Sequence, residues 1–220
     1  MKIPGDHRGL REYLHMYRTD RKAMSDALKA LDSVNSLKDF ETFLDNELIK
    51  TIKTATGITV RRGSDGLWEF PRADGSVVRE FEIGTHNGLT GSRGTENFFQ
   101  SHHGVQNAWA KERFKGLGVY DEGQAKTLLL RSRNLEGGSR GTPHGIISDL
   151  QKQRYASIST RTFEQELAEL GKDLDIIGTP GSVKAQYLSE VQQYFRGLYD
   201  TLANKMAKDD LTKIFGNWPK

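Results

Sequence analysis

The chain of 220 residues contains no cysteine and no long hydrophobic run. Without cysteine it can form neither a disulfide bond nor a thiolate metal site. A membrane-spanning helix needs about 20 consecutive apolar residues, and no such stretch is present, so we expect no membrane span. The N-terminus lacks a signal-like pattern, so we also expect no conventional secretion signal. No internal repeat or low-complexity segment stands out, which argues against a repeat architecture.

The chain also has only a small excess of positive charge. The chain has 32 Lys and Arg against 29 Asp and Glu, a formal net charge of +3, and an isoelectric point near 9.0. This mild basicity is compatible with an anionic partner such as nucleic acid but does not require one. The chain is long enough to bury a sizeable core, either as one domain or as a domain preceded by a smaller module.

Histidine is sparse too, and three of the six histidines fall in two short motifs. His102 and His103 are adjacent and follow Ser101. The residues at 96–100 favour a strand, and Gly104 favours a turn. In an extended strand adjacent side chains point to opposite faces. One imidazole can therefore ligate a metal ion while its neighbour acts as a base.

The third histidine, His144, lies at a predicted helix start. Thr142 suits the N-cap position, Pro143 suits the first helical position, and a glycine-rich connector precedes them at 137–141. We expect a helix from here through residue 151. Neutral imidazole is a common transition-metal ligand, so His144 can complete a site begun by one histidine of the pair.

Three segments carry a resemblance to a known family: QSHHGVQ at 100–106, GTPHGIIS at 141–148 and QKQR at 151–154. They resemble the SHH-signature toxins of the HNH/endonuclease VII superfamily, loosely from about residue 95 to 200. These are effector domains of bacterial polymorphic toxins. The resemblance implies a ββα-metal fold and a metal-dependent endonuclease that cuts DNA. It also implies a secreted or injected effector, acting in the target-cell cytoplasm and neutralised by a cognate immunity protein.

The resemblance also implies roles for individual residues. His102 and His144 correspond to metal ligands, and His103 corresponds to the general base that activates water. Many members carry another histidine four residues after the helix ligand, where this chain has Ser148, followed by Asp149. The set of metal ligands that these motifs supply is therefore incomplete. Ser148 and Asp149 are candidates for a ligand or for the second shell, unless water, substrate phosphate or a distant carboxylate completes the set.

The chemistry of phosphodiester hydrolysis is compatible with these roles. It needs a deprotonated water and a cation to stabilise the developing negative charge. A histidine with a pKa of about 6.5 can accept that proton near neutral pH. Mg²⁺ or Mn²⁺ suits a site with few protein ligands and phosphate oxygens, while Zn²⁺ or Ni²⁺ suits imidazole. His86 is a weak reserve ligand.

Basic side chains flank the predicted metal helix. Arg131, Arg133 and Arg140 precede it, and Lys152 and Arg154 lie on it. They can form a rim that contacts phosphate, or simply a solvated face. Arg140 and Arg154 are our first candidates for phosphate contact.

The remaining pattern predicts an α+β fold, mostly helical, around a small ββα-metal motif. Apolar spacing favours helices at 10–31, 37–55, 107–114, 122–130, 163–170 and 183–206, and a hairpin at 67–83 with its turn at 71–75. We expect a flexible connection at 84–94, and Trp109 and Phe114 in the core.

We divide the chain into two parts. Residues 1–84 form a helical segment with a hairpin, which serves as an accessory, delivery or immunity-binding part. Residues 85–220 form the nuclease domain. Two alternatives to a DNase remain open, an RNase with the same site and a non-enzymatic nucleic-acid-binding module. The module would use the basic rim but would not need the histidine motifs.

Overall fold

The computed structural model describes residues 52–53, 59–63, 65–72, 74–90, 98–134 and 138–218. The chain divides after Val77 into two compact units, which we describe separately. The predicted helix at 10–31 and most of the one at 37–55 lie outside the described residues. Among the residues that the structure describes, no helix combines the length and apolar character needed to cross a membrane.

The first unit contains a short antiparallel meander. Strand β1 (Ile52–Lys53) pairs with β2 (Thr59–Arg62), which pairs with β3 (Trp68–Pro71). The sequence-based helix at 37–55 is therefore wrong at its end, because residues 52–53 pair with a neighbouring strand instead. Trp68 is buried, and the Arg62 guanidinium lies 4.5 Å from its ring centroid.

The predicted turn after β3 is confirmed. The backbone N–H of Arg72 donates to the Ser76 carbonyl at 2.8 Å, and the Gly75 N–H donates to the Arg72 carbonyl at 3.0 Å. Gly75 has a φ of 83°, a conformation that glycine adopts without steric cost. The next strand, β4 (Val77–Arg79), is shorter than predicted and does not reach Ile83.

The second unit is built on a three-stranded antiparallel sheet in the order β5-β7-β6. Its strands are β5 (Ile83–Thr85), β6 (Phe99–His103) and β7 (Lys126–Arg131). The prediction of a helix at 122–130 is wrong. Leu128, Leu129 and Leu130 are buried in the central strand, and a short apolar run of this kind fits a buried strand as well as a helix.

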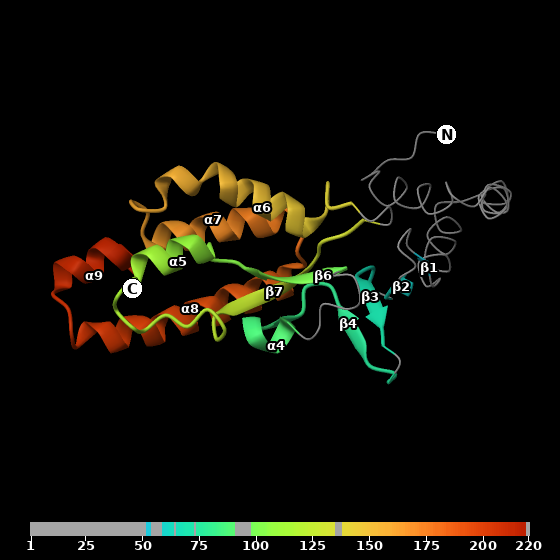
Figure 1. Cartoon of the computed structure of the whole chain (residues 1–220), viewed down its shortest axis with the longest axis horizontal. Helices are drawn as coiled ribbons and strands as arrows, with labels where there is room; N and C mark the ends of the chain where they lie inside the picture. The colour runs from blue at the N-terminus through green and yellow to red at the C-terminus, as the bar shows by residue number, and fades with distance from the viewer. Residues whose placement is uncertain are drawn as a thin grey trace, which may run out of the picture. The chain divides into compact units, whose positions relative to one another are not determined.

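Helices surround this sheet (Figure 1). They are α4 (His86–Thr90), α5 (Asn107–Arg113), α6 (Pro143–Gln153), α7 (Phe163–Ile176), α8 (Gly181–Ala203) and α9 (Lys208–Phe215), with a 3₁₀ turn η2 (Tyr155–Ser157) after α6. Both α6 and α8 pack against β7, and α8 also packs against α7 and α9. The predicted helices at 107–114, 163–170 and 183–206 are confirmed as α5, α7 and α8. Helix α4 replaces part of the connection expected at 84–94.

An aromatic core joins the helices of this unit. Phe163 of α7 stacks on Phe195 of α8 with ring centroids 4.4 Å apart, and Phe215 of α9 lies 6.2 Å from Phe163. Trp109 is fully buried, and Phe114 is 4% exposed, so both belong to the core as the sequence predicts. The second unit thus combines a small sheet with a helical layer, and the α+β class with a ββα motif (β6, β7, α6) is confirmed.

Candidate functional site

The two adjacent histidines of β6 serve different faces of the strand. His102 stands opposite Leu128 of β7, and His103 stands opposite Thr127. The His102 side chain meets α6, whereas the His103 side chain faces α4 and the loop that precedes β7. The alternation expected of an extended backbone therefore creates two distinct groups of side chains around β6.

His102 and His144 form the first group. Their ring centroids lie 5.0 Å apart with an interplanar angle of 89°. The residue His102 is 8% exposed, and its buried Nε2 has no hydrogen-bond partner among the described residues. Burial, followed by the positive charge of His144 and then His103, lowers the pKa of His102 well below its usual value. Two imidazoles held close together, one with an unsatisfied nitrogen, fit a metal ion well.

The N-terminus of α6 fixes the position of His144. Thr142 caps the helix, accepting a hydrogen bond from the Gly145 backbone N–H at 3.2 Å, and Pro143 occupies the first turn. The Thr142 hydroxyl also donates to the Ser139 carbonyl at 2.7 Å. This is the helix start that the sequence predicts, and it aims the first-turn side chain at β6.

A polar cavity of about 590 Å³ opens beside His144. Its lining includes the predicted site residues Arg140, Ser148 and Asp149, together with Arg133 and Lys152. The Lys152 ammonium lies 3.5 Å from the Asp149 carboxylate, and both side chains are largely exposed. The structure thus gathers His144, Ser148, Asp149 and Arg140 around one cavity, with basic side chains at its walls.

Arg154, the other candidate for phosphate contact, is placed differently. Its Nη1 donates to the Asp173 carboxylate at 2.8 Å, and its Nη2 donates to the second carboxylate oxygen. The side chains are 17% and 2% exposed respectively. The Asp173 hydrogen bond raises the pKa of the guanidinium. These contacts favour a role for Arg154 in holding α6 to α7. Contact between Arg154 and substrate phosphate stays a prediction, and the ion pair with Asp173 does not favour it.

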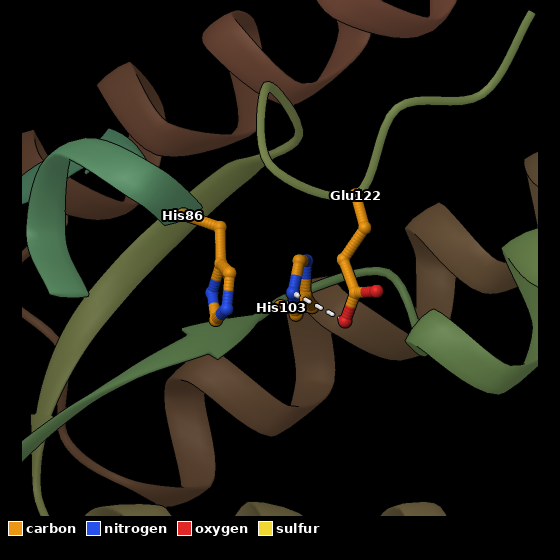
Figure 2. Close-up of side chains that lie close together, drawn as sticks. All are labelled: His86, His103 and Glu122. Carbon is orange, nitrogen blue, oxygen red and sulfur yellow. Dashed lines mark ion pairs between the residues drawn. The ribbon is translucent and has the colours of Figure 1, made fainter.

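His103 belongs to the second group, which Figure 2 shows. Its ring stacks on that of His86 with centroids 4.5 Å apart, and its Nε2 lies 3.9 Å from the Glu122 carboxylate. One donor atom from each of His86, His103 and Glu122 lies within 4.8 Å of the others. Burial, followed by repulsion from His86, lowers the pKa of His103 to about 4, while Glu122 acts in the opposite direction.

Hydrogen bonds hold Glu122 in this group. Its carboxylate accepts from the Asn107 side-chain amide at 2.6 Å and from the Lys111 ammonium at 2.6 Å. The Asn107 amide oxygen in turn accepts from the Tyr120 hydroxyl at 2.8 Å. The Lys111 bond is the main reason that the pKa of Glu122 is lowered. Residues of α5 therefore position a carboxylate facing His103.

Side chains of α6 and α8 hold the backbone at the end of β6. The Tyr187 hydroxyl of α8 accepts from the Gly104 N–H at 2.9 Å, and the Gln151 side chain donates to the His103 carbonyl at 3.2 Å. A Cβ at Gly104 would lie 2.7 Å from the Tyr187 hydroxyl, so only glycine permits this close approach. Contacts from α6 and α8 thus hold the histidine pair in place.

Comparison with known proteins identifies the segment that contains this site. Residues 96–196 match the family model of an HNH/Endo VII superfamily toxin with a SHH signature. This segment is similar to SHH-signature toxin domains. The match covers β6, β7, α6 and α7, and therefore the whole ββα motif, and the activity class of the family is that of a nuclease. No curated protein and no solved structure matches the chain.

The sequence alone did not identify Glu122 as a site residue, and it gave His86 only a reserve role. His86 lies on a short helix, α4, and Glu122 lies in the loop before β7. Both reach His103 only because β5 and β6 pair with opposite edges of β7. No local motif marks such a contact. Glu122 was the first residue of the helix predicted at 122–130, and it would have been informative only with β7 correctly assigned as a strand.

Proposed function

We propose that this protein is a metal-dependent nuclease toxin that hydrolyses phosphodiester bonds of DNA. The observation that carries the proposal is the approach of His102 to His144, with ring centroids 5.0 Å apart, inside the ββα motif of the toxin-family segment. A buried, unsatisfied imidazole nitrogen next to a second imidazole has an obvious use as a metal ligand and no evident use in packing.

His102 and His144 would hold the metal ion, and Ser148 and Asp149 would support it from the cavity wall. The ion would be Mg²⁺ or Mn²⁺, with Zn²⁺ or Ni²⁺ as the alternatives that imidazole ligands accept. When bound, such an ion stabilises the negative charge that develops on the scissile phosphate. The protein supplies the fixed positions of the two imidazoles, which the capped start of α6 and the paired strand β6 provide.

His103 is the general base of the proposed reaction. Its pKa is lowered to about 4, so the imidazole is neutral at neutral pH, the state in which a base has its lone pair available, although it is a weaker base than an ordinary histidine. The negative charge of Glu122 favours the imidazolium that forms when His103 takes a proton from water.

Arg140 would contact the substrate backbone. Its exposed side chain lines the cavity beside His144, near Arg133 and Lys152. A guanidinium can bind a phosphate group through two parallel hydrogen bonds. Such contacts would position a nucleic acid without selecting its sequence, which suits an enzyme that damages any chromosome.

The similarity of residues 96–196 to the toxin family supports a biological role. We propose that the protein is a secreted or injected effector, that it acts in the cytoplasm of competing bacteria, and that a cognate immunity protein neutralises it. The immunity protein should be acidic where it covers the basic cavity, since complementary charge speeds association. Residues 1–84 would serve as an accessory part, in delivery or in binding the immunity protein, and residues 85–220 would carry the activity.

Expression in bacteria tests this function. Induction of the wild-type chain without an immunity protein should stop growth and fragment chromosomal DNA, while His103→Ala, produced at the same level, should not. Fragmented RNA with intact DNA would instead support the RNase alternative. Normal growth with intact DNA and RNA and a folded product would contradict the toxin proposal, and toxicity that survives His103→Ala would contradict the proposed chemistry.

A further inference from the structure

The cluster of His86, His103 and Glu122 brings together two imidazoles and a carboxylate from three separate segments. Figure 2 shows the three side chains converging from α4, β6 and the loop before β7. One donor atom from each lies within 4.8 Å of the other two. Two histidines with one glutamate are a donor set that proteins use for zinc.

We propose that this cluster is a second metal site, separate from the His102–His144 centre, that binds Zn²⁺ or a similar transition-metal ion. Tetrahedral zinc with bonds of about 2.0 Å places its ligand atoms about 3.3 Å apart. The His103 Nε2 and the Glu122 carboxylate oxygen are 3.9 Å apart. The Glu122 side chain is 38% exposed, and a small rotation that closes the difference requires its hydrogen bonds with Asn107 and Lys111 to adjust.

The surroundings of both histidines suit metal binding. The buried His103 Nε2 has no hydrogen-bond partner within the part of the chain that the structure describes. The Ser101 hydroxyl lies 3.0 Å from His86 Nδ1. A contact of this kind orients the ring and, with the proton on Nδ1, directs the Nε2 lone pair toward a ligand. Metal-binding histidines commonly use their second nitrogen in this way.

Lys111 is the natural competitor for this site. Its ammonium lies 2.6 Å from the Glu122 carboxylate. A positive charge therefore already lies beside the cluster. Its side chain is 55% exposed, which allows it to move into solvent when a metal ion takes over the carboxylate. Zinc affinity should therefore rise when Lys111 is removed.

Zinc at this site would switch the nuclease off. An ion held by His103 Nε2 uses the lone pair that the base needs, so water activation stops while the His102–His144 centre stays available. This consequence rests on the proposed function, in which His103 is the base. The zinc site itself does not depend on it.

Zinc titration of the full chain in a His144→Ala background favours the cluster, because that substitution removes one of the two imidazoles of the other centre and so weakens its metal binding. Calorimetry should show one bound Zn²⁺, and Co²⁺ should give the visible absorption of a tetrahedral site. Adding His86→Ala or Glu122→Gln should weaken binding by roughly tenfold or more, and adding Lys111→Ala should strengthen it. Absence of zinc binding in the His144→Ala protein, or binding unaffected by all three further substitutions, would overturn the site.

The Lys111→Ala variant controls for misfolding, because a general loss of structure cannot strengthen zinc binding. A parallel assay of Mg²⁺-supported cleavage separates the two proposals. Zinc should inhibit the wild-type protein more strongly than His86→Ala, each measured relative to its own zinc-free rate. Cleavage that zinc does not inhibit would overturn the switch, while zinc binding without cleavage under any divalent metal would overturn the nuclease function but leave the site standing.

Discussion

His102 of β6 and His144 of α6 meet edge to face, although they come from distant parts of the chain. The pairing of β6 with β7 fixes the first residue, and the Thr142 cap of α6 fixes the second. Packing of α6 against β7 brings them together. The same strand turns His103 toward His86 and Glu122, so one dipeptide supplies both a proposed ligand and a proposed base.

Removal of the base should abolish cleavage without removing the metal. His103→Ala should lower the rate of cleavage by about two to four orders of magnitude, the usual contribution of a general base. Mn²⁺ binding at the His102–His144 centre should be largely retained, since the substitution leaves both ligands in place. Single-turnover cleavage and calorimetric titration of the same preparation measure the two effects. Full activity of a folded His103→Ala protein at neutral pH would exclude His103 as the base.

The ligand variants should behave in the opposite way. His102→Ala and His144→Ala should each weaken Mn²⁺ binding by about tenfold or more, and excess metal should restore part of the cleavage activity because His103 is intact. Calorimetry and a metal titration of the cleavage rate check this. The assignment fails if both variants bind Mn²⁺ as tightly as the wild type.

Arg140 and Arg154 offer a matched pair of substitutions. Arg154→Ala leaves the buried Asp173 carboxylate without its main partner, which should lower the free energy of unfolding by about 3–5 kcal/mol. Arg140→Ala removes an exposed side chain, so stability should stay the same. DNA affinity, measured without metal in a His103→Ala background, should fall for Arg140→Ala, and the dependence of log affinity on log salt should decrease by about one. Unchanged affinity and salt dependence would remove Arg140 from the substrate surface.

Acid should destabilise the metal-free protein. The pKa of His103 is about 4 in the folded state and about 6.5 in an unfolded chain. Between these values the unfolded chain binds a proton that the folded chain excludes, so the free energy of unfolding falls as the pH drops from about 6.5 to about 4. The lowered pKa of His102 acts in the same direction.

Urea denaturation in EDTA across this pH range measures the effect. The His103→Gln variant carries no titrating ring at this position, so its stability should decline less steeply than that of the wild type. Identical slopes for the two proteins would show that His103 does not hold a lowered pKa.

Local signals predicted the strand and the helix that carry the candidate site. The strand-like setting of the histidine pair and the Thr142-Pro143 helix start are both encoded in neighbouring residues, and the structure has β6 and α6 there. The turn after β3 has an equally local cause in the backbone freedom of Gly75. The bounds of elements and the type of short apolar segments were predicted less well, as the error at β7 shows.

The parts that were not predicted depend on contacts between distant segments. Helix α4 has an Asn-Gly sequence with little intrinsic preference for a helix, but the His86 and Asn87 N–H groups donate to the carbonyls of Ala125 and Gly123. Helix α9 was not anticipated either, and its Phe215 is held by the aromatic core. The environment of Arg154 depends on Asp173 of α7, which no spacing in the sequence indicates.

The most direct test is to incubate the purified full chain with plasmid DNA and with total RNA, with Mg²⁺, with Mn²⁺ and with EDTA, beside His103→Ala. We predict that the wild-type protein cuts the plasmid when a divalent metal is present, that EDTA stops cleavage, and that His103→Ala is inactive under all conditions. A folded wild-type protein that cuts neither polymer with any divalent metal, or that cuts equally well in EDTA, would contradict the account.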